Sequence, residues 1–249
     1  MDQPEEIFFD TTCPHCRRTL SFPEGAAGTV QDCPMCGEIV VVSRDKTPLA
    51  GKLPLPIITS RLRLRPPVVA DAPKLEAFMC DPAVFRYWDM EPTAPEDIEP
   101  AIAKPWSNRL TQEAGTICLA IETADRVIGL AWFNYAGTER TQGAIYAVIH
   151  PEFQRRGYGS EAARALLGFC FTGINLRRVM AACDSRNEAA CRMLEKTGMR
   201  REGELVQGTL LRGELVNTVL YAMLAPEFHR PLPRHAHAEP APPAEYSSK

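Results

Sequence analysis

The sequence predicts an α+β protein in which a small, cysteine-bearing β module precedes a larger domain of strands and helices. Three observations lead to this prediction. The first 46 residues hold two Cys-x₂-Cys pairs, apolar strand-like runs begin near residue 57, and a hexapeptide rich in glycine and arginine joins a strand to an amphipathic helix. A chain of 249 residues is long enough for one sizeable domain and a small one.

The composition is that of a soluble globular protein and excludes several classes of partner. Hydrophobic residues make up 45% of the chain, charged residues make up 24%, and the formal net charge is −3, so no basic excess attracts nucleic acid. The first ten residues lack the apolar core of a signal peptide, and no uncharged apolar run approaches the length of a membrane span. We therefore expect a cytoplasmic protein in a reducing compartment, with no membrane partner.

The first four cysteines form a motif with the spacing of a metal site. Cys13 and Cys16 make one Cys-x₂-Cys pair, Cys33 and Cys36 make another, and sixteen residues separate the pairs. This spacing is typical of a structural zinc site in which four thiolates surround one ion. Disulfides are the alternative, but a reducing compartment disfavours them, and neither pair opens a helix as a thioredoxin-like redox motif would.

The segment at 1–46 resembles a zinc ribbon. Its minimal β core is too small to fold by apolar burial alone, so the metal would supply much of the folding free energy. That core consists of Ile7, Phe8, Phe9, Leu20, Phe22 and the strand at 39–42. Eight acidic residues against four basic ones disfavour contact with phosphate backbones, so we expect a structural or protein-contact module, with His15 as a solvated spacer. The proline-rich segment at 47–56 is predicted to be a linker that lets the two modules move relative to each other.

From residue 57 the sequence alternates between strand and helix patterns. In chain order, these patterns predict a strand at 62–65, a helix capped by Asp71 that carries Leu75, Phe78 and Met79, a proline-interrupted region at 95–110, a hairpin of strands 116–122 and 127–133 around Ala124 and Asp125, and a strand at 143–149. The last of these strands leads directly into the glycine-containing hexapeptide.

The hexapeptide at 154–159, Gln-Arg-Arg-Gly-Tyr-Gly, is called the glycine loop below. It opens an apolar helix that is predicted to begin at Ser160. Gly157 and Gly159 free the backbone to turn its N–H groups toward one point, and the helix adds the positive end of its dipole. Because Arg155 and Arg156 add cations, the pattern predicts a site for the linked phosphates of a nucleotide or cofactor. A plain strand-to-helix turn with two exposed arginines is the alternative.

The elements after the glycine loop complete a cofactor-binding half-domain. The patterns predict a helix that buries Ala163, Leu166, Leu167, Cys170 and Phe171, a strand at 178–183, a helix at 188–196 with Asn187 as N-cap and Gly198 at its end, turns at Gly208 and Gly213, a strand at 216–224, and a disordered tail at 226–249.

Three blocks in this order resemble the signature of the GCN5-related N-acetyltransferase (GNAT) family. They are Gln-Arg-Arg-Gly-Tyr-Gly-Ser-Glu-Ala at 154–162, Arg-Asn-Glu-Ala at 186–189 and Leu-Glu-Lys-Thr-Gly-Met at 194–199. The segment at 59–65 resembles the first strand of the RimJ/RimL-like group, which acetylates protein N-termini and small amines. The resemblance covers about residues 57–225 and implies a mixed, mostly antiparallel central sheet with helices on both faces.

The resemblance also implies a co-substrate and a reaction. The phosphates would belong to acetyl-CoA, whose thioester a neutral amine attacks while backbone N–H groups stabilise the oxyanion. The implied cofactor-binding residues are Val148, Ile149, Gln154, Arg155, Arg156, Gly157, Tyr158, Gly159, Ser160 and Asn187. The acceptor would be a protein N-terminus or a small amine. The aromatic residues Phe85, Tyr87, Trp88 and Trp106 could line its pocket or could be plain core.

The chain departs from its relatives where many of them carry a serine or tyrosine near the departing sulfur. The corresponding positions hold Ala190 and Leu194, neither of which donates a proton, and the adjacent Cys191 points elsewhere on the helix. Candidate bases near the expected cleft are Tyr146, His150, Cys183 and Asp184, and nothing in the sequence ranks them. The reaction could use water in these roles. The alternatives to an enzyme are a catalytically silent acyl-CoA sensor and a scaffold that acts through the zinc ribbon.

Overall fold

The computed structural model describes residues 8–13, 16–26, 29–37, 39–42, 55–103, 116–124, 126–136 and 140–228. Residues 8–42 are called the ribbon below, and residues 55–228 are called the main domain. Several features predicted above lie outside the described residues: Ile7, His15, the linker up to residue 54, Trp106, Asp125 of the hairpin turn, and the tail from residue 229 onward.

The main domain alternates strands and helices, and the ribbon is all strand apart from one short 3₁₀ turn. The described strands are β1 Phe8–Thr12, β2 Thr19–Pro23, β3 Val30–Asp32, β4 Ile39–Val41, β5 Ile57–Ile58, β6 Arg63–Arg65, β7 Thr116–Glu122, β8 Val127–Ala136, β9 Gln142–Ile149, β10 Arg178–Asp184, β11 Arg200–Leu211 and β12 Glu214–Leu224. The α-helices are α1 Ala72–Met79, α2 Pro95–Ala103, α3 Tyr158–Gly168, α4 Glu188–Lys196 and α5 Ala225–Phe228. The 3₁₀ turns are η1 Glu24–Ala26, η2 Val69–Asp71 and η3 Pro151–Phe153, and the π-helical turn η4 Phe169–Gly173 continues α3.

Ten of these strands form one sheet, in the order β11-β12-β10-β9-β8-β7-β6-β5-β3-β4, while β1 and β2 make a separate hairpin. Neighbouring strands in the sheet pair antiparallel, except for β9 with β10 and β3 with β5, which pair parallel. The sheet is therefore mixed and mostly antiparallel, which confirms the architecture that the family resemblance implied.

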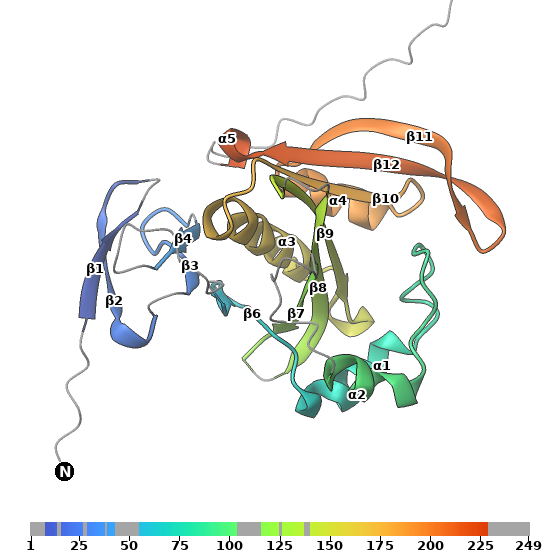
Figure 1. The fold of residues 1–249 in the computed structure, drawn as a ribbon, viewed down its shortest axis with the longest axis horizontal. Coiled ribbons are helices and arrows are strands. Elements are labelled where there is room, and N and C mark those ends of the chain that lie inside the picture. The colour runs from blue at the N-terminus through green and yellow to red at the C-terminus, as the bar shows by residue number, and fades with distance from the viewer. Residues whose placement is uncertain are drawn as a thin grey trace, which may run out of the picture.

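Helices cover both faces of this sheet, with α1 and α2 on one side of β7 to β9 and α3 on the other (Figure 1). Strand β7 shows why both faces are buried. Ile117, Leu119 and Ile121 belong to the core cluster under α3, whereas Cys118 and Ala120 belong to the cluster under α1 and α2. Because alternate residues of a strand point to opposite faces, a strand buried on both faces reads as a continuous apolar run.

The ribbon is part of the central sheet, although the sequence predicted two modules that move relative to each other. Its strand β3 pairs parallel with β5 of the main domain, with Val30 opposite Ile57. Both side chains are fully buried in the cluster that also contains the α3 side chains. The prediction followed from the proline-rich composition of the linker, which carries no information about where the chain pairs afterwards.

Helix α3 begins at Tyr158, two residues before the predicted start at Ser160. Gly157 occupies the N-cap position with φ 83° and ψ −4°, a left-handed conformation that favours glycine. This conformation turns the chain into the helix at once, so Gly159 lies in the first helical turn instead of in the loop.

Asp71 stands at the N-cap of α1 as predicted, but its carboxylate makes no capping hydrogen bond to that helix. Instead it accepts hydrogen bonds from both terminal nitrogens of the Arg65 guanidinium, at 2.7 and 2.9 Å, and from the N–H of Val68 at 2.9 Å. A bidentate ion pair with arginine is stronger than a single capping hydrogen bond, which explains why the Asp71 carboxylate faces Arg65 and not the helix.

Two further predictions near the C-terminal end need correction. Gly208 does not make a turn but lies within β11, where the register with β12 shifts between Leu205 and Thr209. Residues 226–228 were predicted to belong to a disordered tail, but they lie in α5, Ala225–Phe228, and the side chain of Phe228 is 1% exposed in the core. The predicted turn at Gly213 is present, with φ 83°. Among the described residues, no helix combines the length and the apolar character needed to cross a membrane.

Candidate functional site

The site begins where two parallel strands of the sheet part. Strands β9 and β10 pair over only three positions, from Gln142 opposite Arg178 to Ala144 opposite Met180, although both strands continue beyond them. A cavity of about 380 Å³ lies at this opening. Its lining comes from β9 (Ile145, Tyr146, Ala147), β10 (Ala181, Ala182, Cys183, Asp184), α3 (Ala163, Leu166), α4 and the residue before it (Asn187, Ala190, Met193, Leu194), β11 and β12 (Thr209, Leu211, Val216, Thr218), and the segment after α1 (Tyr87, Trp88, Asp89).

The direction of the β9 amides follows from its pairing with β8. The N–H of His150 donates to the carbonyl of Ile128 at 2.8 Å, and the antiparallel register continues without a shift along the strand. Because alternate residues of an antiparallel strand bond to the same neighbour, Val148 also directs its N–H toward β8. The amides of Ile149 and Ala147 face the opposite side, where β10 has moved away. Val148, predicted to bind the cofactor, therefore does not offer its N–H to the opening.

The glycine loop follows directly after this strand and η3. Its backbone is tightly turned, with positive φ at Arg155 (62°) and Gly157 (83°). Within the described part of the chain, no acceptor bonds the N–H groups of Gly157, Tyr158, Gly159 or Ser160, whereas the next amide, that of Glu161, donates to the carbonyl of Gly157 at 3.1 Å. These open amides lie at the N-terminus of α3, where the helix dipole favours an anion.

The side chains of the loop divide between exposed cations and supports. Arg155 and Arg156 are exposed, while Tyr158 is half-buried. Gln154 donates from its side-chain nitrogen to the carbonyl of Ile149 at 2.9 Å, so it ties the loop back to the end of β9. Arg155 and Arg156 thus carry positive charge at the surface of the loop, where the Arg156 guanidinium lies 5.5 Å from the centre of the Phe153 ring, and the Gln154 side chain holds the loop against β9.

Helix α4 presents one face to the cavity. The side-chain oxygen of Asn187 accepts a hydrogen bond from the N–H of Ala190 at 3.1 Å, which confirms its predicted capping role, and Asn187 also lines the cavity. Ala190 and Leu194 also line the cavity, and they occupy the positions where many relatives carry a serine or a tyrosine. Cys191 turns away, with its Sγ 3.5 Å from the Sγ of Cys183.

Of the four candidate bases, Tyr146, Cys183 and Asp184 line the cavity and His150 does not. Burial, followed by the contact with Cys191, raises the pKa of Cys183 to about 12, so this thiol stays protonated at neutral pH. Burial alone would raise the pKa of Asp184, but hydrogen bonds from the guanidinium and N–H of Arg186 outweigh it and lower the pKa. Asp184 is therefore a paired carboxylate.

The aromatic residues after α1 split between core and cavity. Phe85 is 1% exposed and belongs to the core, which is one of the two alternatives that the sequence left open for it. Tyr87 and Trp88 line the cavity, and the ring of Trp88 lies 6.1 Å from that of Tyr146 and 6.0 Å from that of Trp132. The exposed carboxylate of Asp89 follows in the same lining.

The sequence of the main domain matches a known family over most of its length. The profile of the Acetyltransferase (GNAT) domain covers residues 61–200, which is more than half of the chain. The chain belongs to the GNAT acetyltransferase family. It is an enzyme of this family, an acetyl-CoA-dependent acyltransferase.

Individual relatives agree with this assignment. The uncharacterized N-acetyltransferase YoaA of Bacillus subtilis (strain 168) is 32% identical over 171 residues, which cover 68% of this chain and 96% of that protein. The crystal structure of a GNAT-family acetyltransferase from Bacillus anthracis superposes with a TM-score of 0.60 and 26% identity, over 68% of this chain and 97% of that one. The spermidine N(1)-acetyltransferase of Escherichia coli (strain K12) is 32% identical over 72 residues, or 29% of this chain and 39% of that protein.

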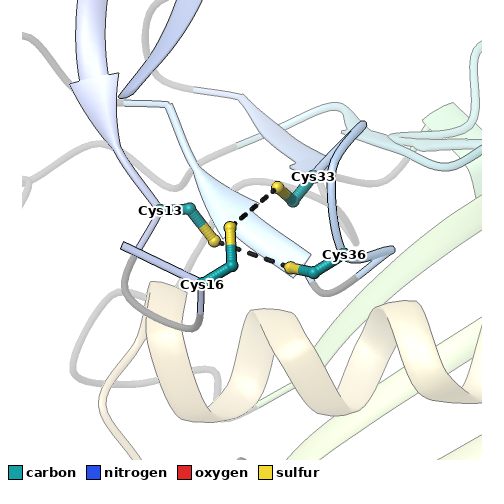
Figure 2. A group of neighbouring side chains, drawn as sticks. All are labelled: Cys13, Cys16, Cys33 and Cys36. Carbon is teal, nitrogen blue, oxygen red and sulfur yellow. Dashed lines mark hydrogen bonds between the residues drawn. The ribbon is translucent and has the colours of Figure 1, made fainter. Parts of the chain in front are cut away.

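In front of the GNAT domain, the four N-terminal cysteines meet at one point. Their sulfur atoms all lie within 4.8 Å of one another, and Figure 2 shows the four side chains directed toward a common centre. The Sγ atoms of Cys13 and Cys36, and those of Cys16 and Cys33, are 3.8 Å apart. Thiolates that surround zinc tetrahedrally at about 2.3 Å lie about 3.8 Å from one another. None of the four forms a disulfide, and the distances between their sulfur atoms fit a metal site.

Tight turns present these sulfurs as the spacing predicted. The N–H of Arg17 donates to the carbonyl of Cys13 at 2.9 Å, and the N–H of Gly37, with φ 72°, donates to the carbonyl of Cys33 at 2.8 Å. The N–H of Met35 also donates to the Sγ of Cys33 at 3.4 Å. A hydrogen bond from the backbone at Arg18 lowers the pKa of Cys16 to about 7 against the opposing effect of burial, which favours the thiolate that a metal needs.

The structure brings two residues to this region that the sequence did not single out. One is Ala147, whose N–H faces the opening because of the register of β9 against β8, which no local pattern reveals. Arg61 was read only as part of an alternating strand, yet its guanidinium lies 4.7 Å from the centre of the Tyr158 ring in the glycine loop. The alternation of arginine with leucine at 61–65 does show that Arg61 faces away from the core. Its hydrogen-bond partner, Glu161, lies 100 residues further along the chain and could not be identified from this pattern.

Proposed function

We propose that this enzyme transfers the acetyl group of acetyl-CoA to a primary amine, either a protein N-terminus or a small amine. The observation that carries the proposal is the opening between β9 and β10, which leaves the Ala147 and Ile149 amides unpaired beside the cavity. This opening lies one short turn before the glycine loop, whose own amides are open. One extended ligand with phosphates at one end and a thioester at the other fits this sequence of donors.

We place the phosphates of acetyl-CoA at the glycine loop. The N–H groups of Gly157 through Ser160 and the exposed side chains of Arg155 and Arg156 are the donors, and the α3 dipole adds to their attraction. The pantetheine arm would then follow the open edge of β9, with Asn187 on the facing helix. Gln154 contributes indirectly by holding the loop against Ile149.

The chemistry we propose is direct aminolysis. The neutral amine nitrogen forms a bond to the thioester carbon, the carbonyl oxygen gains negative charge, and the carbon–sulfur bond breaks as coenzyme A leaves as a thiolate. Hydrogen bonds from the open β9 amides stabilise the developing charge. The amine loses a proton and the thiolate gains one. Cys183 is held as a thiol and Asp184 is paired with Arg186, so we assign these transfers to water or to the Tyr146 hydroxyl.

The cavity lining supports a cationic amine as the acceptor that arrives from solution. Tyr87, Trp88 and Tyr146 present aromatic faces, and Asp89 adds a carboxylate at the same wall. Aromatic faces and carboxylates both attract an ammonium group, and the amine must lose its proton before it reacts. The similarity to a spermidine acetyltransferase over 72 residues supports the same class of acceptor.

Replacement of Gly157 by aspartate tests the cofactor site. Gly157→Asp should abolish acetyl-CoA binding measured by isothermal titration, because φ 83° strains any side chain at this position and the added carboxylate, beside the Arg61 guanidinium, brings negative charge to the loop that would hold the phosphates. Gly157→Ala separates strain from charge, and Gly203→Asp adds the same charge at a position with open space around it. Normal affinity in Gly157→Asp would remove the glycine loop from the site.

Turnover decides between the enzyme and the silent acyl-CoA sensor. Purified protein with acetyl-CoA should release free thiol when peptides with free N-termini or polyamines are added. Binding of acetyl-CoA without thiol release across such a panel would favour the sensor. The absence of any binding heat would favour the scaffold.

Asp89→Asn tests the acceptor wall. We expect a higher KM for polyamines, by about threefold to fivefold, with little change for neutral-tailed amines, since an exposed carboxylate contributes up to about 1 kcal/mol to an ion pair. Asp81→Asn, which removes a carboxylate at the end of α1 outside the cavity lining, is the matched control. Equal KM values in wild type and Asp89→Asn for every amine would exclude Asp89 from acceptor binding.

We also propose that the ribbon holds one structural zinc ion on Cys13, Cys16, Cys33 and Cys36. Four protein thiolates complete a tetrahedral shell and leave no position for a catalytic water. The exposed side chains of Phe8 and Met35, at 54% and 51%, make the outer surface of the ribbon the candidate contact for a protein partner. Elemental analysis of wild-type protein that finds no zinc would exclude the metal.

A further inference from the structure

One turn of the main domain, residues 59–61, lies between the ribbon and the glycine loop. It joins β5 to β6 and is bonded on both sides. On the ribbon side, the N–H of Ser60 donates to the carboxylate of Asp32 at 3.0 Å. Asp32 is the last residue of β3 and directly precedes the predicted zinc ligand Cys33. The turn therefore contacts the ribbon one residue from its metal site.

On the side of the glycine loop, one carboxylate of α3 accepts several hydrogen bonds from the same turn. Glu161, in the first turn of that helix, accepts hydrogen bonds from the hydroxyl of Thr59 at 2.6 Å and from the N–H of Arg61 at 3.0 Å. The guanidinium of Arg61 adds a charged bond to Glu161 from Nε at 2.6 Å. Because the Glu161 side chain is only 15% exposed, water competes weakly with these donors.

Arg61 then reaches into the glycine loop itself. Its Nη1 donates to the carbonyl of Arg156 at 3.1 Å, and its guanidinium lies over the ring of Tyr158. In a trans peptide the carbonyl and the following N–H point in opposite directions. A bond that fixes the Arg156 carbonyl therefore aims the N–H of Gly157 away from Arg61, toward the side where the ligand would lie. Since Glu161 already pairs with its charge, Arg61 is a positioning residue and not a phosphate ligand.

The order of β3 in turn depends on the metal site. The ribbon has a small core of its own, in which two predicted ligands, Cys13 and Cys33, are among the buried members. A core of this size cannot hold strands without the metal. Strand β3 carries the pairing of Val30 with Ile57 and the Asp32 carboxylate that accepts the N–H of Ser60, while β4 also lies against α3 and η4.

We propose that the zinc ribbon supports the acetyl-CoA site: metal binding orders β3, β3 fixes the turn at 59–61, and Arg61 of that turn fixes the Arg156–Gly157 peptide. This inference rests on the proposed function, because it assumes acetyl-CoA at the glycine loop and zinc in the ribbon. Loss of zinc then weakens coenzyme A binding although no metal ligand touches the cofactor.

Titration of coenzyme A into four full-length variants tests the chain of contacts. Arg61→Met should weaken binding about tenfold, the effect of one charge-assisted hydrogen bond, and Asp32→Ala should weaken it about threefold. The controls are Arg63→Met, an exposed arginine two residues along that faces Glu122, and Asp10→Ala, an exposed aspartate of the ribbon that bonds Ser21. Both controls should bind coenzyme A like the wild type. Wild-type affinity in Arg61→Met would overturn the proposal.

Hydrogen exchange, read with and without a zinc chelator, keeps the test independent of any variant's folding. Chelation should speed exchange in residues 57–65 and 154–161 as well as in the ribbon, and should weaken coenzyme A binding by about the factor seen for Asp32→Ala. Faster exchange confined to residues 8–42, with unchanged affinity, would refute the support. A zinc-loaded wild type that binds no coenzyme A would instead defeat the proposed function, while the exchange at 154–161 would still report on the contact chain.

Discussion

The ribbon and the main domain share one sheet but are held together by different forces. The main domain buries large side chains on both faces of β7, β8 and β9, with Phe133, Phe169 and Phe78 among the fully buried ones. Among the described side chains of the ribbon, the largest buried one is Phe22, and its small cluster includes Cys13 and Cys33. Burial of apolar area therefore suffices for the main domain, whereas the ribbon would need the proposed metal.

This contrast shows that continuity of hydrogen bonding does not make two regions equally stable. The ladder from β5 to β3 joins them through one pair of residues, Val30 and Ile57. Regions of a protein open with free energies set by their own contacts, so the ribbon can open while the main domain stays folded. Three substitutions test this difference, beginning with the one of largest effect.

Cys33→Ser should remove the metal and unfold the ribbon alone. Structural zinc contributes on the order of 10 kcal/mol to folding in small metal modules, which is more than the ribbon core can replace. Zinc content should fall to zero by elemental analysis, and amide exchange should become fast at 8–42 while the strands from β7 to β10 stay protected. Cys80→Ser, at the end of α1, should keep its zinc. Global unfolding in Cys33→Ser would break the contrast.

Phe133→Ala should show the opposite pattern. Phe133 is fully buried in β8 and its ring lies 4.9 Å from that of Tyr135, so truncation leaves a cavity that costs about 3–5 kcal/mol of unfolding free energy. Denaturant unfolding followed by tryptophan fluorescence should report the loss, and zinc content should not change under native conditions. The exposed Phe8→Ala serves as control. A loss of zinc at low denaturant in Phe133→Ala would mean that the two regions unfold together.

Glu202→Gln should have the smallest effect, confined to acid. Hydrogen bonds from Arg178 and Arg200 lower the pKa of Glu202 from 4.5 to about 2. A depressed pKa in the folded state means that the carboxylate stabilises the fold above pH 4.5, and that this contribution is lost as pH falls from 4.5 toward 2. The pair is partly exposed, so we expect about 1 kcal/mol or less at neutral pH. The free energies of unfolding of the wild type and Glu202→Gln, plotted against pH, should converge near pH 2. A difference that stays constant with pH would exclude this role of the Glu202 carboxylate.

Local rules predicted much of this molecule. Gly157 and Asn187 were correctly expected at a turn and a cap, because positive φ and a capping oxygen are properties of single residues. The spacing of the two cysteine pairs likewise predicted that their four sulfur atoms meet at one point, which they do. These features need only a few neighbouring residues to be specified.

What the sequence did not reveal depends on contacts between distant segments. Strand register decides that the N–H of Ala147, and not that of Val148, faces the opening. The ribbon joins the sheet through the pairing of Val30 with Ile57, on the far side of a linker that has no periodic pattern. Arg61 and Glu161 are 100 residues apart, and neither local sequence predicts that the two side chains meet. The composition after Pro226 predicted a tail, whereas α5 carries the side chain of Phe228 into the core.

The pairing of β3 with β5 also determines what a shortened protein would expose. Strand β5 has the ribbon on one side and β6 on the other, and the sheet ends at β4, a strand of only three residues. Short terminal strands protect a sheet against adding strands from other molecules. A polypeptide that starts at residue 57 would uncover the backbone of Ile57 and the apolar surface around it, so we expect it to self-associate more strongly than the full chain.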